Sequence, residues 1–460
     1  MIPFIVLALG SIWITVNIFL LPFYPWTEGL YRPWLLLRGL LPYRDHLWNR
    51  GMIDISLLAA VYKIIGVHPI SYQLVVAVVF LLTGFLLFGY LRKLSLRLAL
   101  LAYSMFIVFL FPLFSNAEIE EILVGFFALC TFFSSWELTR RNKPIWLIWA
   151  GLFSGLSLMT KQTSGVLILV MVLFLWKRWK WIGLYSLGVL MPVAAVVLFL
   201  WFHGALNDYI QGLLFVATIY KGWAKAWGIN TALNMIGVYM AILVPFLLIA
   251  RTSISQSKVK HLLSGFILAL FVMLLPSYWS YRLVASFPLL CIGAAFVLLE
   301  ANTYIKTKGN TPRKMLFVSA FIVFLISIIR PVNEYRRYIL DNGFSPNQYL
   351  VDYSENELAA ARWLRDNTEE TEKVFNMANN IIMMRANRLP FNRYVGGMPI
   401  DYLPFAQTTA ELISKPPKVV VYDRRLIDDW PELSGWGFLD FLRQNYTLQQ
   451  EFDTIGIYTL

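Results

Sequence analysis

The sequence is poor in charged residues and in cysteine. Only 14% of its 460 residues are charged, whereas 58% are hydrophobic and 16% are aromatic. This composition excludes an ordinary soluble protein and indicates an integral membrane protein. The two cysteines, Cys130 and Cys291, lie inside apolar runs, which excludes a disulfide framework and a zinc cluster. We expect them to face lipid or to fill the core.

Several catalytic and nucleotide-binding motifs are also missing. The sequence contains no glycine-rich phosphate loop, no HExxH helix, no nucleophile elbow and no EF-hand loop. ATP-driven transport, zinc hydrolysis and serine-type hydrolysis therefore have no support. The histidines His46 and His203 are not spaced as metal ligands.

Acidic residues are scarce in the first part of the chain. Residues 1–329 hold 25 Lys and Arg but nine Asp and Glu, a balance of +16, whereas residues 330–460 hold 14 and 18, a balance of −4. The positive charge lies in short loops between apolar runs, and the tail has no basic stripe with stacking aromatics. Nucleic acid is therefore excluded as a partner, and the charge is a signal of membrane topology.

The apolar runs predict a polytopic α-helical membrane protein with about eleven transmembrane helices. A helix that crosses a hydrocarbon core of ~30 Å needs about 20 apolar residues. The first run has no basic segment before it and no small-residue cleavage site before Phe23, so we interpret it as an uncleaved helix. The expected spans are 1–22, 71–91, 98–114, 119–138, 145–160, 163–176, 182–202, 234–250, 262–276, 283–300 and 315–329.

Basic residues predict the orientation of these spans in a cytoplasmic membrane. Short cytoplasmic loops are enriched in Lys and Arg. With eleven spans, the N-terminus lies inside, and residues 23–70, 203–233, 277–282 and the tail lie outside. All of the following sixteen residues then face the cytoplasm: Arg92, Lys93, Arg97, Arg140, Arg141, Lys143, Lys177, Arg178, Lys180, Arg251, Lys258, Lys260, Lys306, Lys308, Arg313 and Lys314.

The first outer loop, residues 23–70, is long and amphipathic. Its segment 29–50 (GLYRPWLLLRGLLPYRDHLWNR) is rich in Trp and Arg, which is typical of helices that lie in the membrane interface. The apolar stretch 52–66 is too short to span and is expected to dock beside them.

Residues 330–460 are predicted to form a small extracytoplasmic α/β domain. Ser354 and Glu357 form a capping box that begins the helix ENELAAARWLRDN. Strands are predicted at KVFNM (373–377), KVVVYD (418–423), YTLQQEF and IGIYTL. About 110 residues are enough for a separate core.

Six of the nine acids in the membrane part are predicted to gather at the outer face. A charge at membrane depth is costly unless it faces protein or water. Glu118 and Glu121 are three residues apart and share a helix face, whereas Glu120 points elsewhere. Alternatively, these are solvated charges of the kind favoured at a helix start. The six acids are Glu28, Asp45, Asp54, Glu118, Glu120 and Glu121.

Two isolated cations occur at outer helix ends. Lys161 interrupts the apolar sequence SGLSLMTKQTSGVLIL, and Arg282 precedes the tenth span in PSYWSYRL. Each either reaches the interface with its charged group or pairs with an anion, which would be a carboxylate or a lipid phosphate. Together they would hold a phosphate at the outer leaflet.

The outer loop 203–233 carries three aromatic residues at near-helical spacing, Tyr220, Trp223 and Trp227, with lysines beside them. This pattern is typical of an interfacial aromatic belt, and the less common alternative is stacking on a sugar or lipid.

The order of these features resembles the GT-C superfamily of integral-membrane glycosyltransferases, especially its protein O-mannosyltransferase-like and lipid A aminoarabinose transferase-like branch. The matching segments follow one another along most of the chain: WTEGLY with Glu28, RGLLPYRDHLWNRG with Asp45, NAEIEEILVGFFAL with Glu118, GLSLMTKQTSGVLIL with Lys161, and ELAAARWLRDNT in the tail. The chain departs from the pattern at Ser280, where relatives often have His before the Tyr.

The resemblance implies transfer of a sugar from a polyprenyl-phosphate carrier to a protein, lipid or glycan acceptor at the outer face. Glu28 would be the catalytic base, and Asp45 and Glu118 would orient the acceptor or a divalent ion, Mg or Mn. The donor phosphate would be held by Lys161, Arg282 and Tyr281. The acceptor would meet Arg44, Tyr43 and Trp223.

The chemistry of the residues agrees with this function. An acceptor hydroxyl needs one carboxylate to take its proton, and a phosphate leaving group needs no general acid. Direct displacement would invert the anomeric centre. A transporter or flippase of lipid-linked saccharides is the alternative, and it predicts charges near the midplane and two related halves. A third hypothesis is a noncatalytic anchor that presents the tail, for which the six acids would be dispensable.

Overall fold

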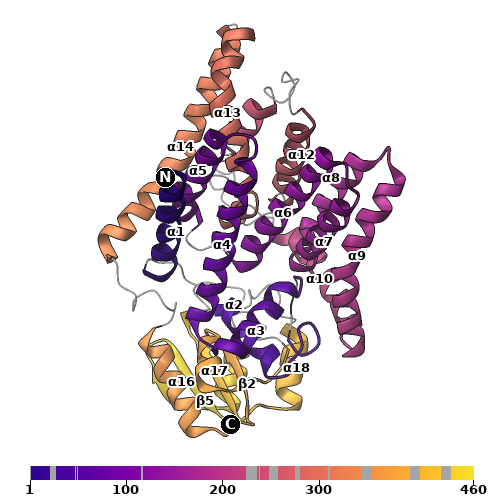
Figure 1. The fold of residues 1–460 in the computed structure, drawn as a ribbon. Coiled ribbons are helices and arrows are strands. Elements are labelled where there is room, and N and C mark those ends of the chain that lie inside the picture. The colour runs from indigo at the N-terminus through magenta and orange to yellow at the C-terminus, as the bar shows by residue number, and fades with distance from the viewer. Residues whose placement is uncertain are drawn as a thin grey trace.

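The computed structural model is a bundle of helices with a small α/β domain at one end (Figure 1). It describes residues 2–20, 27–46, 48, 50–114, 118–223, 236–237, 239–247, 257–274, 280–308, 311–343, 354–393, 405–425 and 437–460.

Four of the described helices are long and apolar enough to cross a membrane, namely α1 (Ile2–Leu20), α4 (Pro69–Leu91), α6 (Ile119–Arg141) and α9 (Trp179–Phe202). The expected spans fall largely on helices, although 234–250 is described only at 236–237 and 239–247. The count of eleven spans remains a prediction. The other helices of the bundle are α5 (Leu96–Phe114), α7 (Ile145–Thr160), α8 (Val166–Leu175), α10 (Leu206–Trp223), α12 (Ser257–Leu274), α13 (Phe287–Lys308) and α14 (Thr311–Asn342), with 3-10 turns η1 (Gln162–Gly165) and η2 (Ser280–Ala285).

Helices α7 and α9 pack closely because glycine lies at their contact. A Cβ on Gly151 would lie 2.1 Å from the Tyr185 carbonyl oxygen, and a Cβ on Gly188 would lie 2.3 Å from the Ile148 carbonyl oxygen. Small residues let helix backbones approach in a membrane, where no hydrophobic effect drives the helices together. The two cysteines lie elsewhere in the bundle and are buried, so they fill the core.

The segment predicted as the first outer loop contains two short helices, α2 (Thr27–Leu37) and α3 (Ile53–Ile65). The expectation that segment 29–50 lies in the membrane interface is wrong for α2. Its side chains Tyr31, Trp34 and Leu35 are buried in one apolar cluster with residues of the α/β domain. The Trp content therefore serves a contact between two parts of the protein, which amphipathicity alone does not distinguish from a contact with lipid.

The α/β domain contains a five-stranded sheet of order β2-β1-β3-β5-β4. The predicted strands are present as β1 (Lys373–Met377), β3 (Val419–Asp423), β4 (Thr447–Phe452) and β5 (Ile455–Thr459), and the two-residue strand β2 (Leu389–Pro390) was missed. Strands β2, β1 and β3 are parallel, whereas β5 and β4 are antiparallel to their neighbours. Helices α16 (Glu355–Asn367) and α17 (Ile381–Ala386) cover the face that meets α2, and α18 (Phe405–Ser414) and α20 (Phe438–Asn445) cover the other face.

The predicted capping box is confirmed at the start of α16. The Ser354 hydroxyl accepts from the Glu357 amide, and the Glu357 carboxylate accepts from the Ser354 amide. Upstream, α14 continues through Pro331 to Asn342, so the domain boundary predicted at 329/330 falls inside a helix.

The α/β domain is joined to the bundle by ion pairs as well as by apolar contact. Arg38, just after α2, lies 2.7 Å from Glu370, and Arg393, just after β2, lies 4.0 Å from Asp208 of α10. We call this end of the bundle the domain end, and the other one the far end.

Candidate active site

Three carboxylates and three cations meet at the domain end, at the start of α6. Glu121 pairs with Lys161 at the end of α7, and Arg282 Nε of η2 lies 3.7 Å from Glu121 Oε1. Arg50, in the loop before α3, pairs with both Glu118 and Glu120. We call these six residues the ion cluster: Arg50, Glu118, Glu120, Glu121, Lys161 and Arg282.

Four members of the ion cluster are buried, Arg50 and Glu118 are half-buried, and the formal charges of the six residues balance. Glu121 is 0% exposed, Lys161 5% and Arg282 4%. Charges at such depth are tolerated only when they are paired, because desolvation costs several kcal/mol per ion. The alternative interpretation of these acids as solvated helix-start charges is therefore wrong for Glu120 and Glu121.

Glu118 and Glu121 were predicted to share a helix face, but they pair with different cations. Glu118 and Glu120 converge on Arg50, and Glu121 faces the other two cations. Spacing along α6 gives the direction of each Cβ, whereas a long guanidinium group can bridge carboxylates that leave the helix in different directions.

Lys161 does not reach the interface with its charged group. It ends α7 in an extended conformation (φ −150°, ψ 119°) and its amide donates to the Ser157 carbonyl oxygen at 2.9 Å. The side chain then turns inward to Glu121. The partner of Lys161 in this structure is therefore a carboxylate, which was one of the alternatives predicted from the sequence.

Gly51 explains how Arg50 reaches the cluster. The Gly51 amide donates to the Thr160 carbonyl oxygen at 3.1 Å, and the Met52 amide donates to the Met159 carbonyl oxygen at 2.8 Å. A Cβ on Gly51 would lie 1.6 Å from that Met159 oxygen. Only glycine lets the loop pair with the end of α7, and this pairing brings the backbone of Arg50 close in space to that of Lys161.

Two further charged residues lie near this loop, Arg32 on α2, which the sequence interpretation did not single out, and Asp54 on α3, which it counted among the acids of the outer face. The buried Arg32 guanidinium lies 4.4 Å from the centre of the Trp48 ring, and the Trp48 indole nitrogen donates to the Gly51 carbonyl oxygen at 2.6 Å. Asp54 is 3% exposed, and burial raises the pKa of its carboxyl to about 7. The sequence signal for both was the presence of a charge in a segment that is otherwise apolar or aromatic.

Asp45 belongs to a separate group of contacts. Arg44 donates to both of its carboxylate oxygens, at 2.9 and 2.7 Å, and to the His203 carbonyl oxygen at 2.9 Å. Burial raises the pKa of Asp45, but the hydrogen bonds from Arg44 and from the Leu41 amide outweigh it and hold the pKa below its usual value. Tyr43 is buried at this loop, and its hydroxyl donates to the Arg50 carbonyl oxygen at 2.5 Å.

Three predicted site residues have side chains outside the described part of the chain. Glu28 is in the first turn of α2, Tyr281 is in η2, and Trp223 is the last residue of α10. Their backbones place them on elements of the domain end, and their roles remain predictions.

The described side chains do not fit a divalent metal at Asp45 and Glu118. These two carboxylates have separate arginine partners, Arg44 and Arg50. No group of three or more His, Cys, Asp or Glu side chains with metal-binding geometry occurs within the described residues. A carboxylate that is already neutralised by a guanidinium group is a poor ligand for a hard cation.

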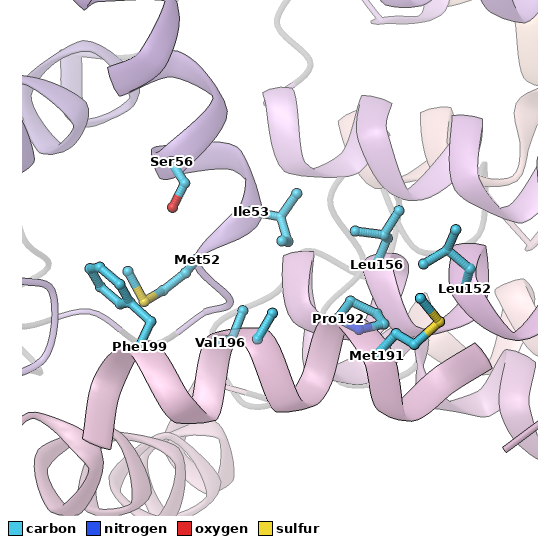
Figure 2. A pocket seen from close by; sticks show the side chains of 10 residues that line it. Met52, Ile53, Ser56, Leu152, Leu156, Met191, Pro192, Val196 and Phe199 are labelled. Carbon is cyan, nitrogen blue, oxygen red and sulfur yellow. The ribbon is translucent and has the colours of Figure 1, made fainter. Parts of the chain in front are cut away.

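An apolar groove of about 410 Å³ lies between α3, α7 and α9 (Figure 2). Ser56 has the only side chain in its lining that carries a hydroxyl group, and Met191 and Phe199 are exposed on the outside of the bundle. The groove begins at Met52, two residues after Arg50. Its lining consists of Met52, Ile53, Ser56, Leu152, Leu156, Met191, Pro192, Ala195, Val196 and Phe199.

Comparison with known proteins finds one family model that matches part of the chain and several solved structures of similar fold. Residues 55–203 match the family described as dolichyl-phosphate-mannose-protein mannosyltransferase. No curated protein sequence matches the chain. The structure of ArnT from Cupriavidus metallidurans bound to undecaprenyl phosphate is similar with a TM-score of 0.58 and 14% identity, over 99% of this chain and 97% of that chain.

Archaeal proteins have the same fold. The oligosaccharyltransferase AglB from Archaeoglobus fulgidus, in complex with an inhibitory peptide and a dolichol-phosphate, is similar with a TM-score of 0.57 and 13% identity, over 99% of this chain and 74% of that chain. The Archaeoglobus fulgidus oligosaccharyltransferase tethered with an acceptor peptide has a TM-score of 0.56 and 13% identity, over 96% of this chain and 72% of that chain.

Proposed function

We propose that this chain, which has the fold of the GT-C superfamily of integral-membrane glycosyltransferases, transfers a sugar from a polyprenyl-phosphate-linked donor to an acceptor at the outer face of the cytoplasmic membrane. The family match and the fold confirm the resemblance predicted from the sequence. The donor class is supported by two similar structures, which hold undecaprenyl phosphate and a dolichol-phosphate.

The ion cluster is the observation that carries this proposal. Lys161 and Arg282 come from different helices and lie against one carboxylate, Glu121, at the domain end. Two cations that face the same carboxylate can together bind a phosphate by charge-assisted hydrogen bonds. In the absence of donor, the single carboxylate of Glu121 faces both cations, and a bound phosphate would share them with Glu121 or replace it.

The groove between α3, α7 and α9 suits the lipid part of such a donor. A prenyl chain is wholly apolar, and burying it recovers about 25 cal/mol per Å² of apolar surface. Its lining includes Met191 and Phe199, which are exposed on the outside of the bundle where lipid would enter, and Met52, which lies two residues after Arg50. A donor in this position would have its phosphate and its sugar at the domain end.

The reaction needs one base in addition to the phosphate site. The acceptor hydroxyl oxygen bonds to the anomeric carbon as the bond from that carbon to the phosphate oxygen breaks, and the phosphate leaves with the electron pair. We assign the hydroxyl proton to Glu28, in the first turn of α2. Asp45, held by Arg44, would orient the acceptor with Tyr43 and Trp223, and Tyr281 would lie beside the donor phosphate.

The test is a transfer assay with matched lysine variants. Purified protein is supplied with a pooled extract of radiolabelled polyprenyl-phosphate sugars, and donor binding and donor consumption are both measured. Lys161→Met should reduce consumption roughly 100-fold, in the range known for loss of a group that stabilises transition-state charge. Lys260→Met is the control, because Lys260 is also buried and pairs with Glu300 at 2.7 Å, at the far end.

The outcomes separate catalysis from folding. The proposal requires that wild type and Lys260→Met consume donor, and that Glu28→Gln binds donor without consuming it. Wild-type protein that neither binds nor consumes any donor in the pool would refute the proposal. Equal losses of donor consumption in Lys161→Met and Lys260→Met would show that the ion cluster has only a structural role.

A further inference from the structure

A second buried carboxylate lies at the far end of α6 and has no part in the proposed reaction. Glu137 is 2% exposed, and three cations converge on it from two elements. Lys93, in the turn after α4, has its Nζ 3.1 Å from Oε1, Arg141 Nε is 2.5 Å from Oε2, and Arg140 Nη1 is 3.8 Å from Oε1.

The charges in this group do not balance. Three cations and one carboxylate leave a surplus of +2. Residues 55–117 contain no acid, and Glu137 is the only acid between residues 122 and 207. The carboxylate is internal, with a side-chain exposure of 3%, whereas the Lys93, Arg140 and Arg141 side chains are 39%, 47% and 45% exposed. The surplus is therefore presented at the surface of the bundle.

The far end has the aromatic residues of a membrane–water interface. Trp176, just after α8, and Trp179, the first residue of α9, are 69% and 74% exposed. Arg178 lies 4.2 Å from the centre of the Trp181 ring. Because α7 and α8 run in succession between the two ends, the turn between α8 and α9 is at the same end as Glu137. Exposed Trp beside basic residues marks the depth of the lipid headgroups.

The three cations are also held in place. Lys93 Nζ lies 3.9 Å from the centre of the Tyr90 ring, which stacks on Phe133 at 4.3 Å, and the Arg141 guanidinium lies 5.9 Å from the centre of the Trp146 ring. These rings fix the long side chains of Lys93 and Arg141, which lowers the entropy lost when an anion binds.

We propose that Lys93, Arg140 and Arg141 form a binding site for the phosphate of an anionic lipid in the leaflet at the far end. Guanidinium groups match phosphate oxygens in pairs of hydrogen bonds, and the lysine adds a point charge. Charge complementarity selects this ligand, because one phosphodiester brings a single negative charge to a surplus of +2. The site is independent of the proposed glycosyl transfer, since it lies at the opposite end of α6 from the ion cluster.

The test compares the full-length protein in nanodiscs of phosphatidylcholine with nanodiscs of equal parts phosphatidylcholine and phosphatidylglycerol. Thermal unfolding gives stability, and native mass spectrometry counts retained phosphatidylglycerol. Glu137→Gln is the decisive variant. It removes the anion that competes with the lipid phosphate for the three cations. The variant should therefore be less stable than wild type in phosphatidylcholine and should regain stability with phosphatidylglycerol. It should bind phosphatidylglycerol about tenfold more tightly, as expected when a unit negative charge is removed from beside the bound phosphate.

Variants that remove one of the cations should have the opposite effect on phosphatidylglycerol binding. Lys93→Met and Arg141→Met should each weaken phosphatidylglycerol binding several-fold, whereas Lys143→Met, an exposed lysine beyond the group, should leave it unchanged. The proposed site would be overturned if Lys143→Met lost as much phosphatidylglycerol binding, or if Glu137→Gln were equally destabilised in both nanodiscs. Either result would indicate a diffuse attraction between the basic residues and anionic lipid. Rescue of Glu137→Gln by inorganic phosphate in phosphatidylcholine alone would overturn the lipid assignment.

Discussion

Replacing Glu121 should destabilise the protein more than replacing Lys161, although the two residues form one ion pair. Glu121 is contacted by Lys161 and by Arg282, the latter at 3.7 Å. Lys161→Met leaves the Glu121 carboxylate with Arg282. Glu121→Gln leaves two buried cations beside a neutral amide, and each has lost the carboxylate that it faced.

The magnitudes follow from burial and distance. Removing one partner of a buried ion pair costs about 3–5 kcal/mol, and unit charges about 4 Å apart interact by about 4 kcal/mol at an effective dielectric constant of 20. We expect about 3 kcal/mol for Lys161→Met and about 5 kcal/mol for Glu121→Gln. With an unfolding entropy of about 2.1 cal/mol/K per residue, a chain of this length loses about 1 °C in Tm per kcal/mol.

The assay is thermal unfolding of the purified variants in one detergent, followed by tryptophan fluorescence. A double variant, Glu121→Leu with Lys161→Met, supplies the decisive comparison. It leaves only Arg282 without this carboxylate and fills the space with apolar groups, so it should be more stable than Glu121→Gln alone. Lower stability of Lys161→Met than of Glu121→Gln, or strictly additive losses in the double variant, would refute mutual compensation within the cluster.

Three further predictions concern the loop and the α/β domain. Gly51→Ala should cost about 1–3 kcal/mol or more, seen as a lower Tm, because its Cβ meets the Met159 oxygen, while Gly89→Ala, with open space around it, should be neutral. Burial raises the pKa of Asp54 to about 7, so the contribution of this group to stability is complete below the unfolded pKa near 3.8 and is lost as pH rises through 7. The free energy of unfolding of the wild type should fall by up to about 4 kcal/mol across this pH range. Asp54→Asn should remove that part of the dependence of Tm on pH. Ser354→Ala should cost about 1 kcal/mol and speed hydrogen exchange in α16 about fivefold, and unchanged exchange would contradict the capping role.

The parts of the fold that could be predicted are those with a local cause. The apolar runs gave the helices of the bundle, because a helix in lipid must satisfy its own backbone hydrogen bonds. The pair Ser354 and Glu357 gave the start of α16, and β-branched runs gave β1 and β3. The strand β2 was missed because two residues carry no periodicity, and its existence depends on pairing with β1.

The candidate site was predictable as a set of unusual charges, and its pairing was not. A lone lysine such as Lys161 in an apolar sequence indicates a partner, but the partner, Glu121, lies 40 residues away. Arg50 was overlooked because it ends a segment with several other arginines, and its distinction depends on the close approach of Gly51 to α7. Contacts of this kind are set by tertiary packing, which leaves no trace in local sequence.

The ion cluster is difficult to explain by stability alone. Replacing a buried ion pair by apolar residues of similar volume is often neutral or stabilising, so a protein selected only for folding has no need of six charges at one helix end. At the far end, Lys260 and Glu300 form a single pair that ties α12 to α13, which is sufficient for a structural link. Glu121 faces two cations, which is one more than a structural link of this kind requires. On the proposed function the donor phosphate competes with a carboxylate already in place, and this weakens ground-state binding of donor and product. Weak binding of both is suitable for an enzyme that must release its lipid phosphate before the next transfer.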